Sequence, residues 1–198
     1  MNSNSISTNP QKLLSPKEVE EYTKMIQERR ITKEKIFNKG GHHASIFLSN
    51  IFENTKDNLY ILSNTLASEV ANFDDYKNEL LRCINNPAIS VKILLVKDID
   101  TSTETYKELS KLYNSTTIKP KNLTIKKLNS AAEAQLKSEF NNNVPNYAVG
   151  DTSFRFEDDL GEFKAFGHFN LGDKNGLIRV LVERFNRAFE IADTLNTI

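Results

Sequence analysis

The sequence predicts an α/β fold in which a mixed, mostly parallel central sheet carries helices on both faces, with a helical extension at the N-terminus. Short apolar segments of strand type alternate with helical segments through most of the chain. Two strands, residues 58–63 (NLYILS) and 90–96 (SVKILLV), are apolar at most positions, which is typical of the middle of a parallel sheet. Three more strand-like segments follow one another closely after residue 145, so they pair largely as hairpins and make the sheet mixed.

The composition is that of a soluble globular protein. The 198 residues suffice for one well-buried core or at most two small ones, with 38% apolar and 26% charged residues. The 26 basic residues balance the 26 acidic ones, which argues against a nucleic-acid binder that is basic all over but leaves room for a local basic patch. No apolar run approaches the roughly 20 residues that cross a bilayer, and the N-terminus lacks a secretion signal. We therefore expect a cytoplasmic protein without membrane insertion.

The first forty residues are predicted to contain a flexible segment and one helix. Residues 1–15 are rich in Asn and Ser and are expected to be mobile. Ser15 then offers an N-cap and Pro16 a first helical position, and the helix runs from acidic to basic residues, as its dipole favours. It is expected to end at a Lys-Gly-Gly sequence, so that residues 16–40 form an N-terminal helix before a single domain, residues 41–198.

Between residues 41 and 140, helices are predicted to alternate with strands. The helices are expected at 42–55, 73–86, 103–114 and 130–140, and the strands at 58–63, 90–96 and 122–128. Asp74 or Asp75 is expected to cap the second of these helices. Ser130 is expected to cap the fourth, where Glu133 completes a capping box.

The final third of the chain is predicted to form three strands and one long helix. The strand-like pieces are NYAVG (146–150), SFRFE (153–157) and FKAFGHFN (163–170). The helix is expected to begin near Asp173. Its apolar residues follow helical spacing and are interpreted as core that covers the sheet; they are Leu177, Val180, Leu181, Phe185, Phe189 and Ala192. We find no internal repeat and no linker, which favours one domain.

Several common catalytic and metal sites are excluded by the sequence. There is no glycine-rich phosphate loop after a strand and no Gly-x-Ser-x-Gly nucleophile motif. The single cysteine, Cys83, excludes an internal disulfide and a multi-cysteine zinc site, and it is expected to be a small buried residue. His42 and His43 are adjacent at a helix start, where joint ligation is awkward, so they are interpreted as solvated residues. We expect no metal and no cofactor.

The order of features in the C-terminal third carries the strongest signal. An apolar strand runs into Gly150-Asp151, a hairpin follows, and a later strand ends in Gly167-His168-Phe169-Asn170 before the long helix. With the helices and strands upstream, this order resembles the phospholipase D superfamily over residues 43–195. Active members carry a His-x-Lys-x4-Asp motif followed by Gly-Ser-x-Asn. In that family the histidine attacks a phosphodiester phosphorus, while lysine and asparagine hold the phosphate oxygens.

The resemblance is incomplete at the reactive positions. When Asp151 is matched to the aspartate of the motif, Asn146 stands where lysine belongs and Val144 where histidine belongs. Asn170 matches the family asparagine, and His168 replaces the serine. Valine cannot attack phosphorus and asparagine cannot supply a positive charge. The resemblance therefore implies a scaffold without its chemistry, a pseudoenzyme.

Arg155 and Glu157 are candidate ligand-binding residues, together with Asn146. They alternate with phenylalanines along one predicted strand, so both belong to the same face of the sheet. One interpretation is an ordinary amphipathic strand. The other places Arg155 in the ancestral cleft, where its planar guanidinium holds an anionic group. The lysines of residues 117–127 likewise form either a solvated edge or a contact to nucleic acid.

Two functional hypotheses remain open from the sequence. The first is a non-catalytic phospholipase D-like binding or regulatory module that recognises a protein or an anionic, phosphate-containing ligand. Since members of the family use two motif copies or a dimer, a single copy implies a homodimer. The second is a phosphodiesterase or nuclease that uses His168 with Asp151 and Asn170. The resemblance and the Asn-, Lys- and Ile-rich composition also suggest a bacterial source and a defence setting. An α/β protein unrelated to the family is the third reading.

Overall fold

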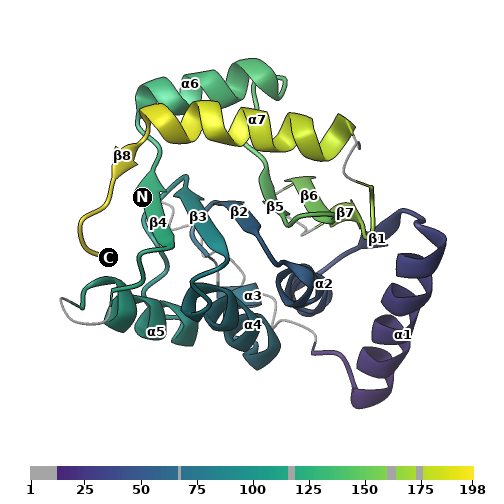
Figure 1. Ribbon diagram of the computed structural model, residues 1–198. Helices are drawn as coiled ribbons and strands as arrows, with labels where there is room; N and C mark the ends of the chain where they lie inside the picture. Colours follow the sequence, from purple (N-terminus) through teal and green to yellow (C-terminus); the bar gives the residue numbers. More distant parts are fainter. Residues whose placement is uncertain (1–12, 67, 116–118, 160–163, 173–175) are drawn as a thin grey trace, which may run out of the picture.

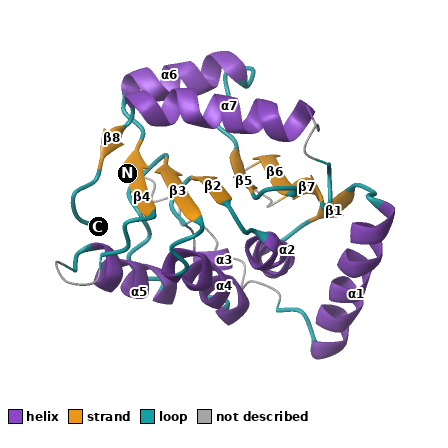
Figure 2. Cartoon of the chain, in the orientation of Figure 1, coloured by secondary structure: helices purple, strands orange, loops and turns teal. Residues whose placement is uncertain are grey.

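One open sheet lies between two layers of helices in the computed structural model, which describes residues 13–66, 68–115, 119–159, 164–172 and 176–198 (Figures 1 and 2). Within these residues the sheet has eight strands in the order β1-β7-β6-β5-β2-β3-β4-β8. The strands are β1 (Ile36–Asn38), β2 (Asn58–Ser63), β3 (Ser90–Leu95), β4 (Leu123–Lys127), β5 (Asn146–Val149), β6 (Phe154–Asp159), β7 (Lys164–His168) and β8 (Asp193–Thr194). Both edges of the sheet are short strands, which limits pairing with other chains.

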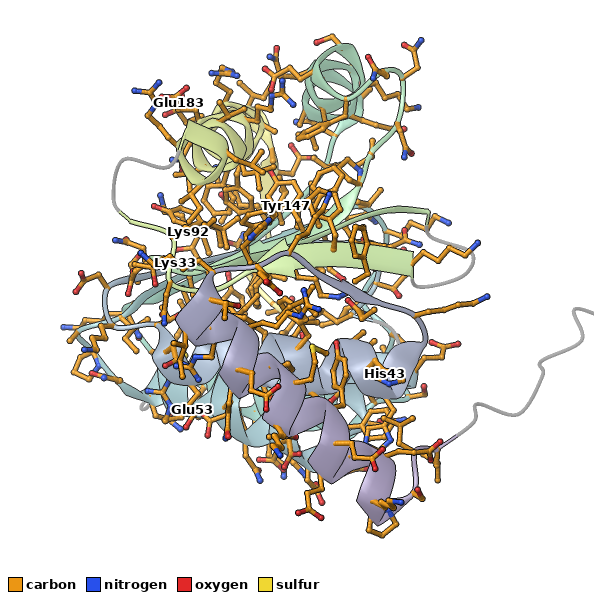
Figure 3. All side chains as sticks on the ribbon, turned by 90° about the vertical axis from the view of Figure 1, so that its right-hand side faces the viewer. Lys33, His43, Glu53, Lys92, Tyr147 and Glu183 are labelled. Atoms are coloured by element: carbon orange, nitrogen blue, oxygen red, sulfur yellow. The ribbon has the colours of Figure 1, made fainter. Side chains whose placement is uncertain are left out.

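The helices cover the two faces of the sheet. On one face lie α1 (Pro16–Thr32), α2 (Gly41–Asn54), α3 (Ser68–Ala71), α4 (Asp74–Asn85) and α5 (Glu104–Tyr113), and on the other α6 (Ser130–Glu139) and α7 (Gly176–Ile191). The side view in Figure 3 shows the same layers, with Tyr147 between the sheet and α6 and α7. In the described part of the chain, no helix has both the length and the apolar character of a membrane span.

The prediction of a mostly parallel sheet is wrong, although the sheet is mixed. The pairs β2–β3 and β3–β4 are parallel, whereas the other five pairs among the described strands are antiparallel. A parallel pair needs a long crossover connection, usually through a helix. The chain provides two such crossovers, through α3 and α4 and through α5. The later strands follow one another through short connections, and β1 and β8 join the edges antiparallel.

The N-terminal helix is shorter than predicted. α1 has the predicted Ser15 cap, with a complete capping box, but ends at Thr32, after which Lys33 adopts a left-handed conformation (φ 57°). Residues 36–38 form β1 and pair with β7. Three residues are too few to show a strand period in the sequence, and the pairing with a distant strand decides their conformation. Of the segment predicted to be mobile, residues 1–12 lie outside the described residues.

Other helix starts differ in detail from the sequence prediction. Asn129, and not Ser130, is the N-cap of α6, and its side chain accepts a hydrogen bond from the backbone of the first turn. Phe73 is the N-cap of α4 without a side-chain hydrogen bond, so the predicted aspartates lie in the first turn, where the helix dipole favours them. α7 begins at Gly176 in the described residues, and the predicted start near Asp173 falls outside them.

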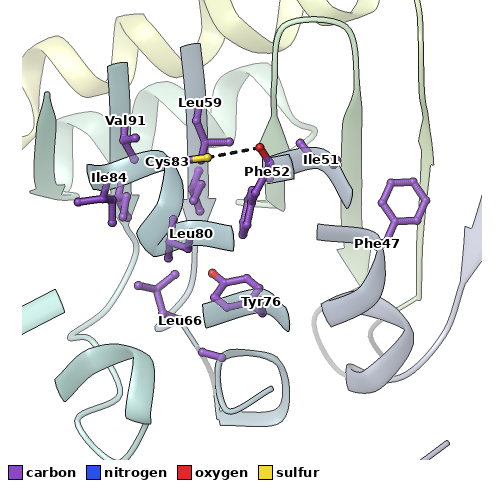
Figure 4. Packing of buried hydrophobic residues seen from close by; sticks show 14 of the residues in the cluster. Phe47, Ile51, Phe52, Leu59, Leu66, Tyr76, Leu80, Cys83, Ile84 and Val91 are labelled. Carbon is purple, nitrogen blue, oxygen red and sulfur yellow. Dashed lines mark hydrogen bonds between the residues drawn. The ribbon is translucent and has the colours of Figure 1, made fainter. Parts of the chain in front are cut away.

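Two apolar clusters fill the space between the sheet and its helices. The larger lies beneath α1–α5 and the other beneath α6 and α7. Figure 4 shows Cys83 of α4 within the first cluster, where its thiol donates to the carbonyl oxygen of Phe52 at 3.4 Å. Cys83 is buried, as predicted, and this burial raises the pKa of its thiol to about 11.

Candidate functional site

A small pocket opens at the end of the sheet where β2 ends and β5 begins. Its polar lining includes Asn64, Asn146, Arg155 and Glu157, and its apolar wall comes mainly from α2, β2, α3 and β5. The cavity volume is about 60 Å³. This volume suits a few water molecules or one small ligand group. We call it the Arg155 pocket.

Strand pairing explains why three of these side chains meet. β5 and β6 are antiparallel, with Asn146 opposite Glu157 and Ala148 opposite Arg155. Paired residues project to the same face of a sheet, and side chains alternate along each strand. Asn146, Arg155 and Glu157 therefore share the face beneath α1–α5, while the phenylalanines of β6 project to the opposite face.

Arg155 and Glu157 form a buried ion pair. Arg155 Nη1 donates to Glu157 Oε2 at 3.1 Å, and the two side chains are only 4% and 3% exposed. Arg155 Nε donates to Asn38 Oδ1 of β1 at 3.3 Å. Burial lowers the pKa of Arg155, whereas the charge of Glu157 opposes this change. The carboxylate of Glu157 thus stabilises the charged guanidinium of Arg155, which burial alone would disfavour.

Three buried donors around this ion pair lack a protein partner. Arg155 Nη2, Asn38 Nδ2 and Tyr22 Oη have no hydrogen bond within the residues that the structure describes. Burial also raises the pKa of Tyr22, while the positive charge of Arg155 opposes the shift. Buried polar atoms are nearly always satisfied, by protein, by water or by a ligand. Since each of these atoms carries a donor hydrogen, the group that would satisfy all three is an acceptor.

Asn146 and Val144 have structural contacts of their own. Asn146 Oδ1 accepts from the backbone N–H of Asn64 at 2.7 Å, which ties the start of β5 to the end of β2. Val144 is 7% exposed and packs in the apolar cluster beneath α6 and α7. It offers no polar atom to the pocket.

Asp151 organises the entry to β2. Its carboxylate accepts from the backbone N–H groups of Lys56, Asp57 and Asn58 at 2.7, 3.1 and 2.9 Å. The preceding Gly150 is needed there, because a Cβ atom would lie 2.5 Å from the hydroxyl of Thr55. Asp151 therefore joins two loops that are more than ninety residues apart in the sequence.

His168 and Asn170 lie at the same end of the sheet as Asp151, away from the Arg155 pocket. His168 of β7 is opposite Phe154 of β6, at the end of the sheet where β5 ends. Both side chains project to the α7 face, and the centroids of their rings are 5.7 Å apart. Asn170 has φ 53°, and its Nδ2 donates to the carbonyl oxygen of Arg30 in α1 at 3.0 Å. The side chains of Asp151 and Asn170 thus engage different elements.

The other histidines do not form a metal site. His42 Nδ1 accepts from the backbone N–H of Leu14 at 3.1 Å, and the ring stacks on Phe73, so it is only partly solvated. His43 contacts the carbonyl oxygen of Lys39. Among the described residues, no three His, Cys, Asp or Glu side chains are placed to hold a metal ion together.

Tyr22 and Asn38 are the residues of this region that sequence reasoning missed. They come from α1 and β1, more than a hundred residues before Arg155 in the chain. A tyrosine in an amphipathic helix and an asparagine in a three-residue strand carry no sequence signal for a shared site. Only the tertiary structure, in which β1 pairs with β7 and α1 packs against α2, brings them near Arg155.

Comparisons with known proteins support the fold. No family model matches the chain, and no curated protein matches its sequence. The structure is similar to TrmBL2, an archaeal chromatin protein described as having a novel mode of DNA binding, with a TM-score of 0.57 and 13% identity over 90% of this chain. It is also similar to phosphatidylserine synthase from Haemophilus influenzae Rd KW20, with a TM-score of 0.50 and 9% identity over 83% of this chain. A third similar structure is NucT from Helicobacter pylori, with a TM-score of 0.49 and 12% identity over 82% of this chain.

At sequence identities this low, the structural similarity shows only that the folds are alike. The chain spans 62% of TrmBL2, 40% of the synthase and 99% of NucT. The similarity to the synthase supports a phospholipase D-like fold.

Proposed function

We propose that this chain is a non-catalytic phospholipase D-like binding module whose Arg155 pocket recognises a small anionic ligand group, of which phosphate is the prototype. The observation that carries the proposal is Arg155, which lines the pocket and whose buried Nη2 has no hydrogen-bond partner among the described residues. Asn38 Nδ2 and Tyr22 Oη, which lie near Arg155 outside the pocket lining, also lack an acceptor there. An anionic oxygen group supplies several acceptor atoms at once, and a guanidinium is well suited to bind it.

Glu157 limits the charge of the ligand that fits. Because its carboxylate already neutralises Arg155, the pocket has no large excess of positive charge. The site therefore favours a singly charged group, or a phosphate ester in which the charge is spread over several oxygens. Its small volume favours entry of the anionic end of a ligand while the rest of the ligand stays outside.

The residues at the motif positions support a role without catalysis. If the chain is aligned with the phospholipase D superfamily, Val144 and Asn146 replace the nucleophile and the phosphate-binding lysine. Val144 is buried among apolar side chains, and the oxygen of Asn146 is held by Asn64. Neither side chain can form a phosphohistidine or carry a positive charge.

Phosphate binding is expected to stabilise the protein measurably. Thermal unfolding would be followed in sodium phosphate and in sodium chloride of equal ionic strength, with isothermal titration of glycerol phosphate as a direct measurement. A ligand at about 100 times its dissociation constant stabilises the native state by roughly 2.7 kcal/mol. An equal Tm in both salts, with no titration heat, would overturn the proposal.

The matched control is the double variant Arg155→Met/Glu157→Leu. Apolar residues of similar size often replace a buried ion pair without loss of stability, so this variant should fold and should lose the phosphate effect. The same phosphate effect in the double variant would place binding elsewhere and contradict the assignment.

The competing assignment is a phosphodiesterase or nuclease that uses His168 with Asp151 and Asn170. One observation favours it: His168 Nδ1 is buried and has no hydrogen-bond partner within the described residues. The purified protein would be assayed with single-stranded DNA, RNA and a generic phosphodiester. We expect no turnover, and an activity that His168→Ala abolishes would contradict the non-catalytic proposal.

A homodimer is part of the proposal, because the chain carries one copy of the motif region. Light scattering of the purified protein measures its mass. A mass of 22.5 kDa would remove the dimer from the proposal without affecting the pocket.

A further inference from the structure

An aromatic row crosses the sheet on the face opposite the Arg155 pocket. Its members are Phe37 of β1, Phe166 of β7, Phe156 of β6 and Tyr147 of β5, each directly opposite the next in the strand pairing. The ring centroids of Phe166 and Phe156 are 5.7 Å apart, and those of Phe156 and Tyr147 are 6.0 Å apart. Strands lie about 4.8 Å apart, so the row is roughly 14 Å long.

The row is buried at its Tyr147 end and open at the sheet edge. Tyr147 is 2% exposed beneath α7, Phe156 and Phe166 are half-buried, and Phe37 is 70% exposed. The open end of the row thus presents an apolar ring to solvent beside the partly buried Phe166. β1 and β7 form the end of the sheet farthest from β8 (Figure 1).

A second opening lies beside Phe156. Phe140, at the end of α6, contacts Phe156 with a centroid distance of 5.8 Å. Both residues line a hollow of about 530 Å³ together with Glu139, Asn141 and Arg184. Phe156 therefore belongs both to the aromatic row and to the lining of the hollow, so the two form one continuous aromatic surface.

Cations lie on the rings at both ends of this surface. Lys35 Nζ is 3.8 Å from the centroid of Phe166 and 4.9 Å from that of Phe37. Arg184 Cζ is 4.6 Å from the centroid of Phe140, and this guanidinium also lies 3.7 Å from Glu139. An aromatic surface that also carries a lysine and an arginine matches a ligand with π-faces and a negatively charged backbone, although Glu139 offsets part of the charge of Arg184.

We propose that the aromatic row and the Phe140 hollow bind a short stretch of single-stranded nucleic acid. One base stacks on the exposed ring of Phe37, and a second stacks on Phe166 when Lys35 moves from that ring to a phosphate, as bases stack on other sheets that carry aromatic residues. Lys35 and Arg184 contact the phosphates, and the amide of Asn141 is available to a base edge.

A single strand fits this surface better than a duplex or a second copy of the chain. In a duplex, the faces of the bases are stacked on one another and cannot reach the rings. In a two-fold symmetric dimer, the same patch meets itself, so Lys35 and Arg184 would face like charges. The formal net charge of zero also means that binding depends on this local patch.

Binding of labelled twelve-nucleotide oligothymidine DNA and oligoadenosine RNA, measured by fluorescence anisotropy, tests the proposal. Phe37→Ala is expected to weaken binding by roughly 5- to 150-fold, the usual loss for one stacked base. Because Phe37 is largely exposed, the variant should remain folded. Ile31→Ala is the matched control, since Ile31 is 82% exposed, apolar and outside the row, and it should bind like the unsubstituted protein.

Salt dependence gives a second, independent readout. With two phosphate contacts, the logarithm of the affinity is expected to fall with the logarithm of salt concentration with a slope of about −1.4, and Lys35→Ala should reduce that slope by about 0.7. Three results would overturn the proposal: no binding at low salt, equal affinity for the matched duplex, or equal affinity of Phe37→Ala. A dimer that Phe37→Ala dissociates would instead assign the row to a second copy and also refute it.

The test is separate from that of the Arg155 pocket. Phe37 and Arg155 project to opposite faces of the sheet. The effect of phosphate on Tm should therefore be unchanged in Phe37→Ala, and either proposal can fail alone.

Discussion

Arg155 and Glu157 depend on each other. Each is nearly fully buried, and each is the nearest opposite charge of the other. Removing one partner of such a pair leaves an uncompensated charge inside the protein, whereas replacing both with apolar side chains does not. The pair therefore contributes to the specificity of the pocket more clearly than to the stability of the fold.

The stability of single and double variants should differ sharply. Arg155→Ala is expected to lower the free energy of unfolding by about 3–5 kcal/mol, and Arg155→Met/Glu157→Leu to change it little. Urea unfolding followed by circular dichroism measures both. Equal losses in the two variants would show that packing, and not the unpaired charge, causes the effect.

Packing alone explains why residue 167 is a glycine, although this glycine also matches the family motif. In the sequence it corresponds to a glycine of the family motif, which suggests a functional position. A Cβ atom there would lie 2.2 Å from the carbonyl oxygen of Phe154 and 2.6 Å from the ring of Phe47. The close approach of α2 to β6 and β7 requires glycine whether or not the site binds a ligand.

At the scale of elements, α1 is the most weakly attached helix near the site. Of its 17 residues only Tyr22 and Ile26 are buried. Arg30 connects its C-terminal end to Asn54 of α2 and to Asn170 after β7. Since Tyr22 contributes to the donor cluster around Arg155, opening of α1 would expose that cluster. Segments with little buried apolar area open at a lower free energy than the core.

Hydrogen exchange can measure the opening of α1. Ser15→Ala removes the cap and should destabilise α1 by about 1 kcal/mol, which makes its amides exchange about fivefold faster. Amides of β2 and β3 should be unaffected. Thr103→Ala, which removes the side-chain cap of α5, is the control and should leave α1 unchanged. Uniform acceleration in all strands after Ser15→Ala would contradict local opening.

At the scale of the whole molecule, the sheet separates two surfaces of different chemistry. The face beneath α1–α5 contains the Arg155 pocket, and the other face, at the edge that α7 leaves open, contains the aromatic row. Because both surfaces use β6, one strand carries Arg155 and Glu157 on one side and Phe156 on the other. A substitution that shifts the register of β6 would damage both surfaces together.

Global stability should depend on pH above the neutral range through Cys83. Burial raises the pKa of its thiol from 9.0 to about 11 in the folded protein. The protonated thiol is thus favoured by folding, so this stabilisation is fully present below pH 9 and is lost as the pH rises towards 11. In urea unfolding, the free energy of unfolding should decrease less between pH 8 and pH 10.5 for Cys83→Ala than for the unsubstituted protein. An identical decrease would contradict the assignment to Cys83.

The sequence alone predicted every described helix except α3, the strands β2 to β7 and the location of the core, although the first helix ends earlier than predicted. Local periodicity and capping residues carry that information, as the Ser15 cap and the buried runs in β2 and β3 illustrate. The same period placed Arg155 and Glu157 on one face of a strand. These features depend on residues that are neighbours in the chain.

Only the tertiary structure decided the direction of the strands, the strand conformation of residues 36–38 and which residues lie next to Arg155. Pairing between distant segments sets all three, and neither Asn38 nor Tyr22 carries a local pattern that reveals its neighbour. The aromatic row has the same origin. Its four rings come from four strands, and they form a surface because the order and register of those strands align them.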